Sequence, residues 1–569
     1  MSFKRTRLKS ALPKKVTSFP PSQRSDGASE GSVDPDGILP EDKANQESSH
    51  GHTDPLGSVN EPQTSERSST QTGQRTQITR RRLHRRAVTL DVLQQPIQAG
   101  MKKVFDLRKL LIVIGLTCAV LLLPQPEGLS VEGHRALALF VFTGSILALE
   151  PAPLPIAALL VPICRVALQI DMNNSIAPLD AALQPFGRPV LFLILGSLFL
   201  AEALRKHGLT RRLALYAIVF SGGHLRMLLF GLMLITSSLS MWVLNTATAA
   251  VLIPVAITIA QQVERPEDAQ GVLKLLILGI AYSSSFGAIA TIMGSGENAI
   301  ASGQSEPPIS FLTWMGYGLP IVLILLPLSW FLLMQSFRLP SITIDTEPAS
   351  KEIERLGVLT NSEKKIVMAL LASASLWISG SWLEAVLNLP QNLLSSAVVA
   401  IGAVAVLSVE EVIDWNDLKG VNWGVFFVIG AGLTLGNALE QTGAGTWFAN
   451  QLAPFLEGLP YSVVIAAMMG ICFTLTQFMN NVTLGAILAP ILIKLGEASG
   501  IPPATLLMPA IISLALAYTL PAASARMTLV AVTGAVERQD MVRSGLIVGI
   551  PSVLTIYGFF VLLQRIGMI

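Results

Sequence analysis

Charged residues are scarce in this chain and unevenly placed. Only 14% of the 569 residues are charged, whereas a soluble domain usually has about 25%. No charge occurs between Arg226 and Glu264 or between Glu457 and Lys494. Uncharged apolar runs longer than the roughly 20 residues that cross a bilayer predict membrane spans. This pattern excludes a soluble enzyme and a fibrous protein.

Cysteine is also scarce, and the motifs of membrane-embedded enzymes are missing. Cys118, Cys164 and Cys472 lie in apolar surroundings, so they predict neither a disulfide framework nor a metal site. The sequence has no His-Glu-x-x-His motif and no pair of aspartates within an apolar run. We therefore predict no catalytic residues and no enzymatic activity.

Aromatic residues are almost missing from residues 1–104, which contain Phe3 and Phe19 but no Trp or Tyr. The segment is rich in Ser, Gln, Pro, Gly and charge, a composition that predicts a disordered tail. It lacks an apolar h-region and contains several acids, which argues against a signal peptide and a transit peptide. Basic residues from Arg80 to Lys109 precede the first apolar run. They predict a cytoplasmic N-terminus by the positive-inside rule, and contact with anionic lipid is the alternative role.

From Leu110 onward the chain is almost wholly apolar. Spans are plausible at 110–124, 134–150, 152–169, 188–204, 226–261, 271–303, 318–337, 365–386, 392–407, 423–439, 460–495, 504–535 and 543–566. Several runs exceed one helix or contain Gly, Pro and Asn, which predicts broken helices and re-entrant hairpins. Because irregular backbone at membrane depth is tolerated only where protein or a water-filled cavity covers it, the interruptions are candidate sites.

Two halves of the apolar region repeat each other. The segment 240–254 parallels 476–490, with the same spacing from Asn245 to Pro254 as from Asn481 to Pro490. Each half then ends in another interrupted run. Paired interruptions in two halves indicate a secondary transporter with its substrate between the repeats. We predict N-terminal spans at 105–186, a first repeat at 187–337 with its tip near 244–248, a cytoplasmic linker at 338–364, and a second repeat at 365–569 with its tip near 480–483.

The tip motifs resemble those of a known family. Leu244-Asn245-Thr246-Ala247-Thr248 and Asn480-Asn481-Val482-Thr483 are similar to Ser-Asn-Thr hairpin tips, and Gly294-Ser295-Gly296-Glu297-Asn298 is similar to Gly-Thr-Pro-Pro-Asn. Trp415, Trp423 and Gly430-Ala431-Gly432 open the second repeat in the same order. Over residues 110–569 the chain resembles the divalent anion:sodium symporters, which include di- and tricarboxylate carriers and sulfate carriers.

The resemblance implies an all-α, elevator-type transporter with two inverted repeats, about eleven spans, re-entrant hairpins and a homodimeric assembly. It also implies a multi-pass protein of the plasma membrane that carries a small divalent anion with sodium, and no nucleic-acid partner or metal besides sodium. The implied substrate contacts are Asn245, Thr246, Asn480, Asn481, Val482 and Ser524. The first cation site would use Ser240, Leu244, Asn245 and Gly294, and the second Thr476, Met479, Asn481 and Ala523.

The chain also departs from the family pattern at these sites. Leu244 and Asn480 replace Ser, and Val482 replaces Thr. Near the second site an Asn has become Met527, and Arg526 is the one charge between Ser499 and Val536. Glu297 stands where the family has Pro. Because an ionisable group at membrane depth is costly, Glu297 and Arg526 are candidates for coupling, and structural pairing or snorkelling is the alternative.

Other interpretations stay open at this point. The tip asparagines could serve as interhelical hydrogen bonds, and Trp242 is expected to pack. Arg205, Lys206, Arg211 and Arg212 predict an amphipathic, interfacial segment with His207 on its solvated face. The other function classes are an anion channel and a scaffold or sensor that acts through its N-terminal tail. The departures also leave open sodium symport, proton coupling and anion exchange, with the second sodium site in doubt.

Overall fold

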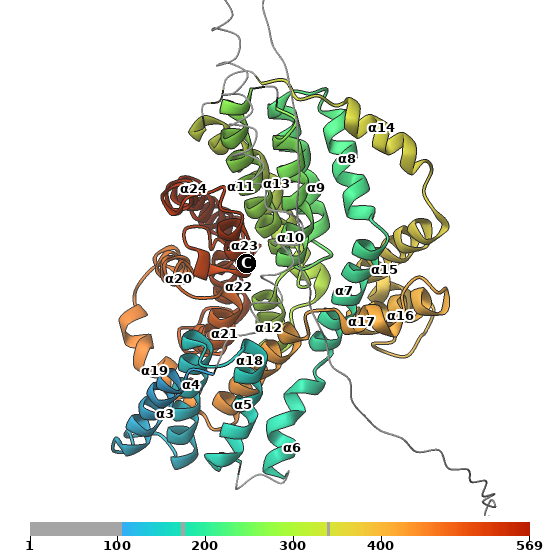
Figure 1. Ribbon diagram of the computed structural model, residues 1–569. Helices are drawn as coiled ribbons and strands as arrows, with labels where there is room; N and C mark the ends of the chain where they lie inside the picture. Colours follow the sequence, from blue (N-terminus) through green and yellow to red (C-terminus); the bar gives the residue numbers. More distant parts are fainter. Residues whose placement is uncertain (1–104, 172–176, 264, 338, 340–341, 569) are drawn as a thin grey trace, which may run out of the picture. The chain divides into compact units, whose positions relative to one another are not determined.

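The computed structural model describes residues 105–171, 177–263, 265–337, 339 and 342–568, which are almost entirely helical (Figure 1). The tail predicted over 1–104 lies outside the described residues. Seven described helices are long and apolar enough to cross a membrane, or eight if one bent pair counts as a single span. The prediction of an all-helical membrane protein is confirmed.

The N-terminal helices precede the first tip. They are α3 (Leu107–Leu122), α4 (Val131–Leu149), α5 (Leu154–Ala167), α6 (Pro178–Leu183), the 3-10 helix η2 (Gln184–Gly187), α7 (Pro189–Lys206) and α8 (Leu209–Phe220). Helices α6 and α7 form the bent pair, with an angle of 46°. Gly208, in the left-handed conformation, separates α7 from α8, because glycine adopts positive φ without a steric penalty.

The predicted first repeat, 187–337, includes α7 and α8, and its remaining five helices surround two interruptions. They are α9 (Leu225–Ser240), α10 (Asn245–Ala260), α11 (Pro266–Ile289), α12 (Gly296–Gln304) and α13 (Phe311–Ser336). Helix α11 packs against α9, α10 and α13. It is the most deeply buried of the candidate spans, with 89% of its apolar window buried. It is therefore the core helix of this group, covered by its neighbours.

The linker between the repeats has structure of its own. Its part from 342 onward forms two isolated β-bridges with the first hairpin. Thr343 pairs with His224, just before α9, and Ile344 pairs with Val263, just after α10. The linker then forms α14 (Glu347–Leu356). The segment predicted as a cytoplasmic linker over 338–364 is therefore partly helical. Helices α15 (Asn361–Val386), α16 (Ser396–Val409) and α17 (Trp415–Lys419) follow it.

The second repeat, from α18 onward, shows the same order of elements as α7 to α13. It contains α18 (Trp423–Gln441), α19 (Ala444–Leu456), α20 (Tyr461–Leu475), α21 (Asn481–Ala498), α22 (Pro503–Leu514), η3 (Pro521–Ala523), α23 (Ala525–Val532) and α24 (Arg538–Arg565). Helices α20, α21, α22 and α23 correspond to α9, α10, α11 and α12. The predicted interruptions of the long apolar runs are confirmed. All four long runs, 226–261, 271–303, 460–495 and 504–535, are broken between two of these helices.

Large apolar side chains remain exposed on several helices. Leu111, Met368, Leu371, Trp382 and Leu554 are each more than half exposed. A water-soluble monomer rarely shows contiguous apolar surface of this kind. These apolar faces of α3, α15 and α24 are therefore suited to contact with lipid or with another apolar protein surface.

The basic segment after the first predicted spans is more buried than expected. Arg211 is exposed and pairs with Glu352 of α14. Arg212, however, is only 3% exposed, and its guanidinium donates to Glu363 and to the carbonyl oxygen of Gly357. The prediction that all four basic residues lie on a solvated face was wrong for Arg212, because α8 packs its side chain against α14 and the start of α15. Trp242 packs as expected, stacked on Trp377 at 5.7 Å.

A buried arginine, paired with a nearby aspartate, joins α5 to α18 by hydrogen bonds. Arg165 is completely buried and makes two hydrogen bonds with Asp171, at 2.8 and 2.7 Å. Its remaining N–H groups donate to Asn437 at 2.9 Å and to Gln441 at 2.8 Å. Every partner except Asp171 lies on α18, so Arg165 holds together helices far apart in the sequence.

We expect Arg165→Ala to lower the free energy of unfolding strongly. Removing one partner of a buried pair leaves the other charge uncompensated, which typically costs about 3–5 kcal/mol. Thermal unfolding in detergent measures the effect. The matched control is Arg211→Ala, which removes an exposed pair worth less than about 1 kcal/mol. Equal unfolding temperatures for the two variants would contradict the structural role of Arg165.

Candidate functional site

A cavity of about 590 Å³ lies where the two repeats meet. Its lining includes residues from the starts of four helices: α10, α12, α21 and α23. Asn245, Gly296, Asn481 and Ala525 are the first residues of these helices, and each lines the cavity. Backbone N–H groups at a helix N-terminus are unpaired within the helix and carry partial positive charge. Four such termini make the cavity suited to an anion.

The first hairpin tip is held against the break after α11. Helix α9 ends at Ser240 and α10 begins at Asn245. The Asn245 backbone N–H donates to the carbonyl oxygen of Gly294 at 3.2 Å, and the Ser240 hydroxyl donates to Ser284 at 2.5 Å. Thr246 donates to the Asn245 side chain at 3.2 Å. The structure therefore brings Ser240, Asn245 and Gly294 together, as the first predicted cation site requires.

Gly294 lies very close to the backbone of the first hairpin. A Cβ atom here would lie 2.4 Å from the Cα of Ala288 and 2.8 Å from the carbonyl oxygen of Ser240. Both contacts are with backbone, so the neighbours cannot move aside without a shift of the main chain. Asn298 holds the same turn by donating to the carbonyl oxygens of Ala288 at 2.8 Å and Thr291 at 2.9 Å.

Buried oxygen atoms without a hydrogen-bond partner collect at this first break. They are Ser295 Oγ, Glu297 Oε2 and Asn298 Oδ1. Unpaired buried oxygens are costly, and hard cations prefer oxygen ligands. The residues at the first break therefore fit a sodium ion.

The second hairpin tip contacts the first repeat directly. Helix α20 ends at Leu475 and α21 begins at Asn481. The Asn481 side chain, 4% exposed, donates to Glu297 Oε1 at 2.7 Å. The Asn480 side chain caps α21 by accepting from the Val482 N–H at 2.9 Å. The tip residues Asn480, Asn481 and Val482 all line the cavity.

The break after α22 is organised around different donors. Thr476 donates to the carbonyl oxygen of Leu514 at 2.8 Å, and Gln477 donates to Leu516 at 2.9 Å. The Gln477 side-chain oxygen accepts from the backbone N–H groups of Tyr518 and Thr519 at 3.1 and 3.2 Å. Sequence reasoning missed Gln477. The signal was the one glutamine in the uncharged run 458–493, next to the predicted Thr476.

Glu297 and Arg526 occupy corresponding positions in the two repeats. Each is the second residue of the short helix after the break, α12 or α23, and each is completely buried. Glu297 lines the cavity. Arg526 instead turns toward the end of α22 and donates to the carbonyl oxygens of Ala515 at 2.7 Å and Ala517 at 3.3 Å. Within the described part of the chain, no ion pair joins the two.

The predicted site residues divide into two sets. Asn245, Thr246, Asn480, Asn481, Val482, Leu244 and Glu297 line the cavity. The residues that do not line it lie in the hairpin turns or at the two breaks: Ser240, Gly294, Thr476, Met479, Ala523, Ser524 and Arg526. Ser524 serves as the N-cap of α23, where its hydroxyl accepts from the Met527 N–H at 3.4 Å.

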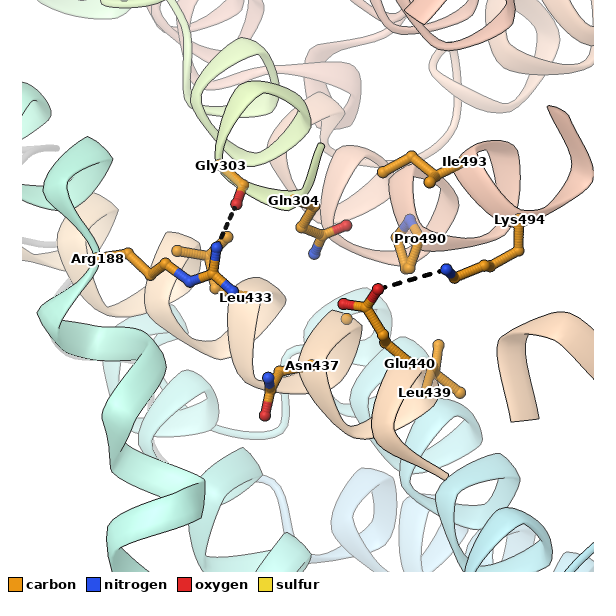
Figure 2. A pocket seen from close by; sticks show the side chains of 11 residues that line it. Arg188, Gly303, Gln304, Leu433, Asn437, Leu439, Glu440, Pro490, Ile493 and Lys494 are labelled. Atoms are coloured by element: carbon orange, nitrogen blue, oxygen red, sulfur yellow. Dashed lines mark hydrogen bonds and ion pairs between the residues drawn. The ribbon is translucent and has the colours of Figure 1, made fainter. Parts of the chain in front are cut away.

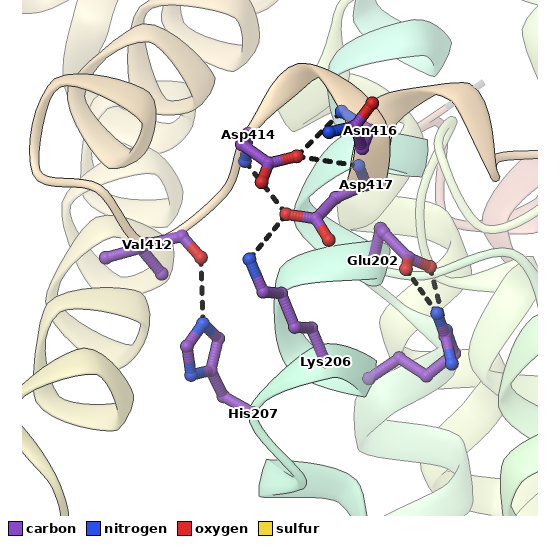
Figure 3. A network of polar contacts seen from close by, with 8 residues as sticks. Glu202, Lys206, His207, Val412, Asp414, Asn416 and Asp417 are labelled. Atoms are coloured by element: carbon purple, nitrogen blue, oxygen red, sulfur yellow. Dashed lines mark hydrogen bonds and ion pairs between the residues drawn. The ribbon is translucent and has the colours of Figure 1, made fainter.

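Polar residues at the end of α7 also reach the cavity. Glu202 and Arg205 line it and form an ion pair (Figure 3). The neighbouring Lys206 pairs with Asp417 of α17 at 2.5 Å (Figure 3). Burial raises the pKa of Asp417, but hydrogen bonds from Lys206 and from the Asp414 backbone outweigh it, so the pKa lies below the ordinary value. His207 contacts the carbonyl oxygen of Val412 at 2.8 Å and is not simply solvated.

A second cavity, between α7, α12, α18 and α21, is much smaller (Figure 2). Its volume is about 20 Å³, enough for about one water molecule. Arg188 donates across it to the carbonyl oxygen of Gly303 at 3.2 Å, and Lys494 pairs with Glu440 at 3.3 Å. It is too small for an organic or inorganic dianion, so we place the substrate in the larger cavity.

Apolar helices that break in pairs around one cavity are typical of secondary transporters. Residues 105–565 match the family described as the sodium:sulfate symporter transmembrane region. The chain belongs to this family. It is therefore a multi-pass integral membrane transporter and not an enzyme.

Several relatives match this chain over most of their own length. The chain is 32% identical over 433 residues to an uncharacterized transporter of Haemophilus influenzae, covering 75% of this chain and 90% of the relative. It is 27% identical over 458 residues to the sodium-dependent dicarboxylate transporter SdcS of Staphylococcus saprophyticus, covering 77% and 87%. Among solved structures, the YdaH transporter of Alcanivorax borkumensis matches with 14% identity and a TM-score of 0.49, covering 76% of this chain and 99% of that one.

Proposed function

We propose that the protein is a secondary active transporter that moves a small divalent anion together with sodium. The substrate is a di- or tricarboxylate or a sulfate-like oxyanion. The observation that carries this proposal is the convergence of four helix N-termini on one cavity of about 590 Å³. That volume lies within the range of about 300–1,000 Å³ that is usual for small-molecule sites. Hydrogen-bond donors and partial positive charge offset the cost of taking a dianion out of water.

Sodium coupling is supported by the first break and by a relative. Three buried oxygen atoms there have no partner, and the surrounding carbonyl groups end a broken helix, as in known cation sites of transporters. The relative from Staphylococcus saprophyticus is named a sodium-dependent dicarboxylate transporter. We infer that Ser240, Leu244, Asn245 and Gly294 lie around the transported sodium ion.

The remaining features of the proposal follow from the resemblance of the tip motifs. The protein works as a homodimer in the plasma membrane, with a cytoplasmic N-terminus, about eleven spans and two inverted repeats. The hairpins α9–α10 and α20–α21 are re-entrant and carry the substrate across by an elevator-type movement. Seven or eight helices meet the length and hydropathy of a span, and the shorter apolar helices make up the rest.

Uptake into vesicles tests the substrate class. We expect purified protein in liposomes to take up labelled succinate, citrate or sulfate in a saturable way, and faster with an inward sodium gradient. Unlabelled dianions should compete, because the cavity supplies donors to anionic oxygens. Liposomes with the Asn245→Ala/Asn481→Ala double variant provide the background. Competition by neutral sugars or by cations, with none by any dianion, would contradict the proposal.

Anion exchange or proton coupling is the second candidate, and the buried Arg526 and Glu297 favour it. A carrier with a fixed positive charge moves that charge when it returns empty, whereas a carrier that returns loaded with an anion does not. Preloading the liposomes with unlabelled substrate distinguishes the candidates. Exchange predicts strong acceleration by internal substrate without a sodium gradient, and a channel would show single-channel currents.

A further inference from the structure

The ends of the two broken helices differ in which atoms are left without partners. Carbonyl groups at a helix C-terminus carry partial negative charge and attract cations. At the end of α11 the partnerless buried atoms are oxygens: Ser295 Oγ, Glu297 Oε2 and Asn298 Oδ1. At the end of α22 they are two N–H groups, Arg526 Nε and Nη1, and the Tyr518 hydroxyl. The first break thus presents oxygen atoms only, one of them a carboxylate oxygen, whereas the second also presents the donors of a cationic side chain.

The carbonyl groups at the end of α22 are already occupied by side chains. Thr476 donates to Leu514, Gln477 donates to Leu516, and Arg526 donates to Ala515 and Ala517. Ser285 also donates to Ala515. All four successive carbonyl oxygens therefore have a hydrogen-bond donor, and one of these donors carries a full positive charge.

In the first repeat, neutral groups donate to the carbonyl oxygens at the end of α11. The carbonyl oxygens of Ala288 and Thr291 accept from the Asn298 amide, and that of Ile289 accepts from the Trp314 indole N–H. The position of Asn298 corresponds to Met527. Only in the second repeat does a cationic side chain reach the helix end, where the face of Tyr518 lies 5.8 Å from the Arg526 guanidinium carbon.

We propose that Arg526 is a resident cation at the second break, so that this break takes no transported sodium ion. The inference rests on the proposed function, because it sets the number of coupled ions at the same substrate cavity. A guanidinium is always charged and holds its hydrogen bonds in a fixed plane. It supplies the positive charge that a sodium ion would otherwise bring, and it repels a sodium ion from the same carbonyl oxygens. Each transport event therefore uses one sodium ion, at the first break.

The test is the dependence of succinate uptake on sodium concentration. With one sodium ion, a tenfold rise in sodium below half-saturation raises uptake about tenfold, and the Hill coefficient is about 1. The variant Arg526→Asn/Met527→Asn removes the charge and places an amide where the first repeat has Asn298. We expect it to become steeper in sodium, with a Hill coefficient rising toward 2. The control Arg526→Lys keeps the charge and should retain a coefficient of about 1.

Several results would overturn the assignment. A Hill coefficient near 2 in the unmodified protein would do so, and so would a double variant that folds and keeps both the uptake and the sodium curve of the parent. If the double variant does not fold, the parent curve decides. Sodium-induced thermal stabilisation in detergent gives an independent reading: one binding site supports the assignment, and two overturn it. Failure of every tested anion to be taken up would contradict the proposed function alone, because the detergent measurement needs no substrate.

Discussion

Asn481→Ala is expected to reduce anion uptake about 100-fold or more. The side chain it removes donates to Glu297 at 2.7 Å from the start of α21 and lines the substrate cavity. Without it both oxygens of the completely buried Glu297 lack a partner, and the site loses a donor. A hydrogen bond to a charged group is worth about 1.5–3 kcal/mol, and about 2.8 kcal/mol corresponds to a factor of 100.

Asn245→Ala should have a similar effect, because Asn245 holds the matching position at the first tip. The apolar packing of each hairpin does not involve these amides, so dimer assembly and expression should be retained. Asn450→Ala is the matched control, since Asn450 is exposed on α19, away from both tips. Uptake at the parent rate in both tip variants, at equal amounts of protein in the membrane, would remove the tips from the binding site.

Gly294→Ala is expected to abolish uptake and to lower thermal stability in detergent. The added methyl group would lie 2.4 Å from the Cα of Ala288 and 2.8 Å from the carbonyl oxygen of Ser240. Because these contacts are with backbone, the break must move away from the hairpin. That movement separates Gly294 from the N–H of Asn245, which ties the two elements together. Overpacking of this kind typically costs about 1–3 kcal/mol, and the first break loses the geometry that fits sodium.

A second glycine provides the control for this substitution. Gly316 lies in α13, and a Cβ atom there would meet nothing within 4 Å. Gly316→Ala should leave both uptake and unfolding temperature close to those of the parent. If Gly294→Ala behaves like Gly316→Ala in both measurements, the tight contact between the first break and its hairpin has no functional importance.

Several features of the fold could be predicted because their causes are local in the sequence. The apolar runs at 226–261 and 460–495 are too long for one span, and each contains a tip asparagine. The helices do break there, after Ser240 and after Leu475. Repeated spacing also identified Asn245 and Asn481 as equivalent, and the structure places both on one cavity. Such predictions need only chain length, hydropathy and the positions of residues that interrupt a helix.

Contacts between distant segments could not be predicted in this way. Glu297 and Asn481 are 184 positions apart, and nothing in either segment indicates that they form a hydrogen bond. Arg212 sits in a segment with the composition of an interfacial helix, yet packing against Glu363 buries it. Which partner a buried polar group finds depends on how helices pack, and hydropathy carries no information about that.

A membrane protein with two similar halves, interrupted at corresponding places, could be inferred before any coordinates, because span length and helix interruption are properties of short stretches of chain. The role of the interruptions depends instead on the packing of distant helices. Folding brings four helix N-termini to one cavity, leaves unpaired oxygens at the first break, and turns Arg526 onto the carbonyl groups at the end of α22. A lone arginine in an apolar run must find hydrogen-bond acceptors. Which acceptors lie within its reach is decided by the packing of the helices around it.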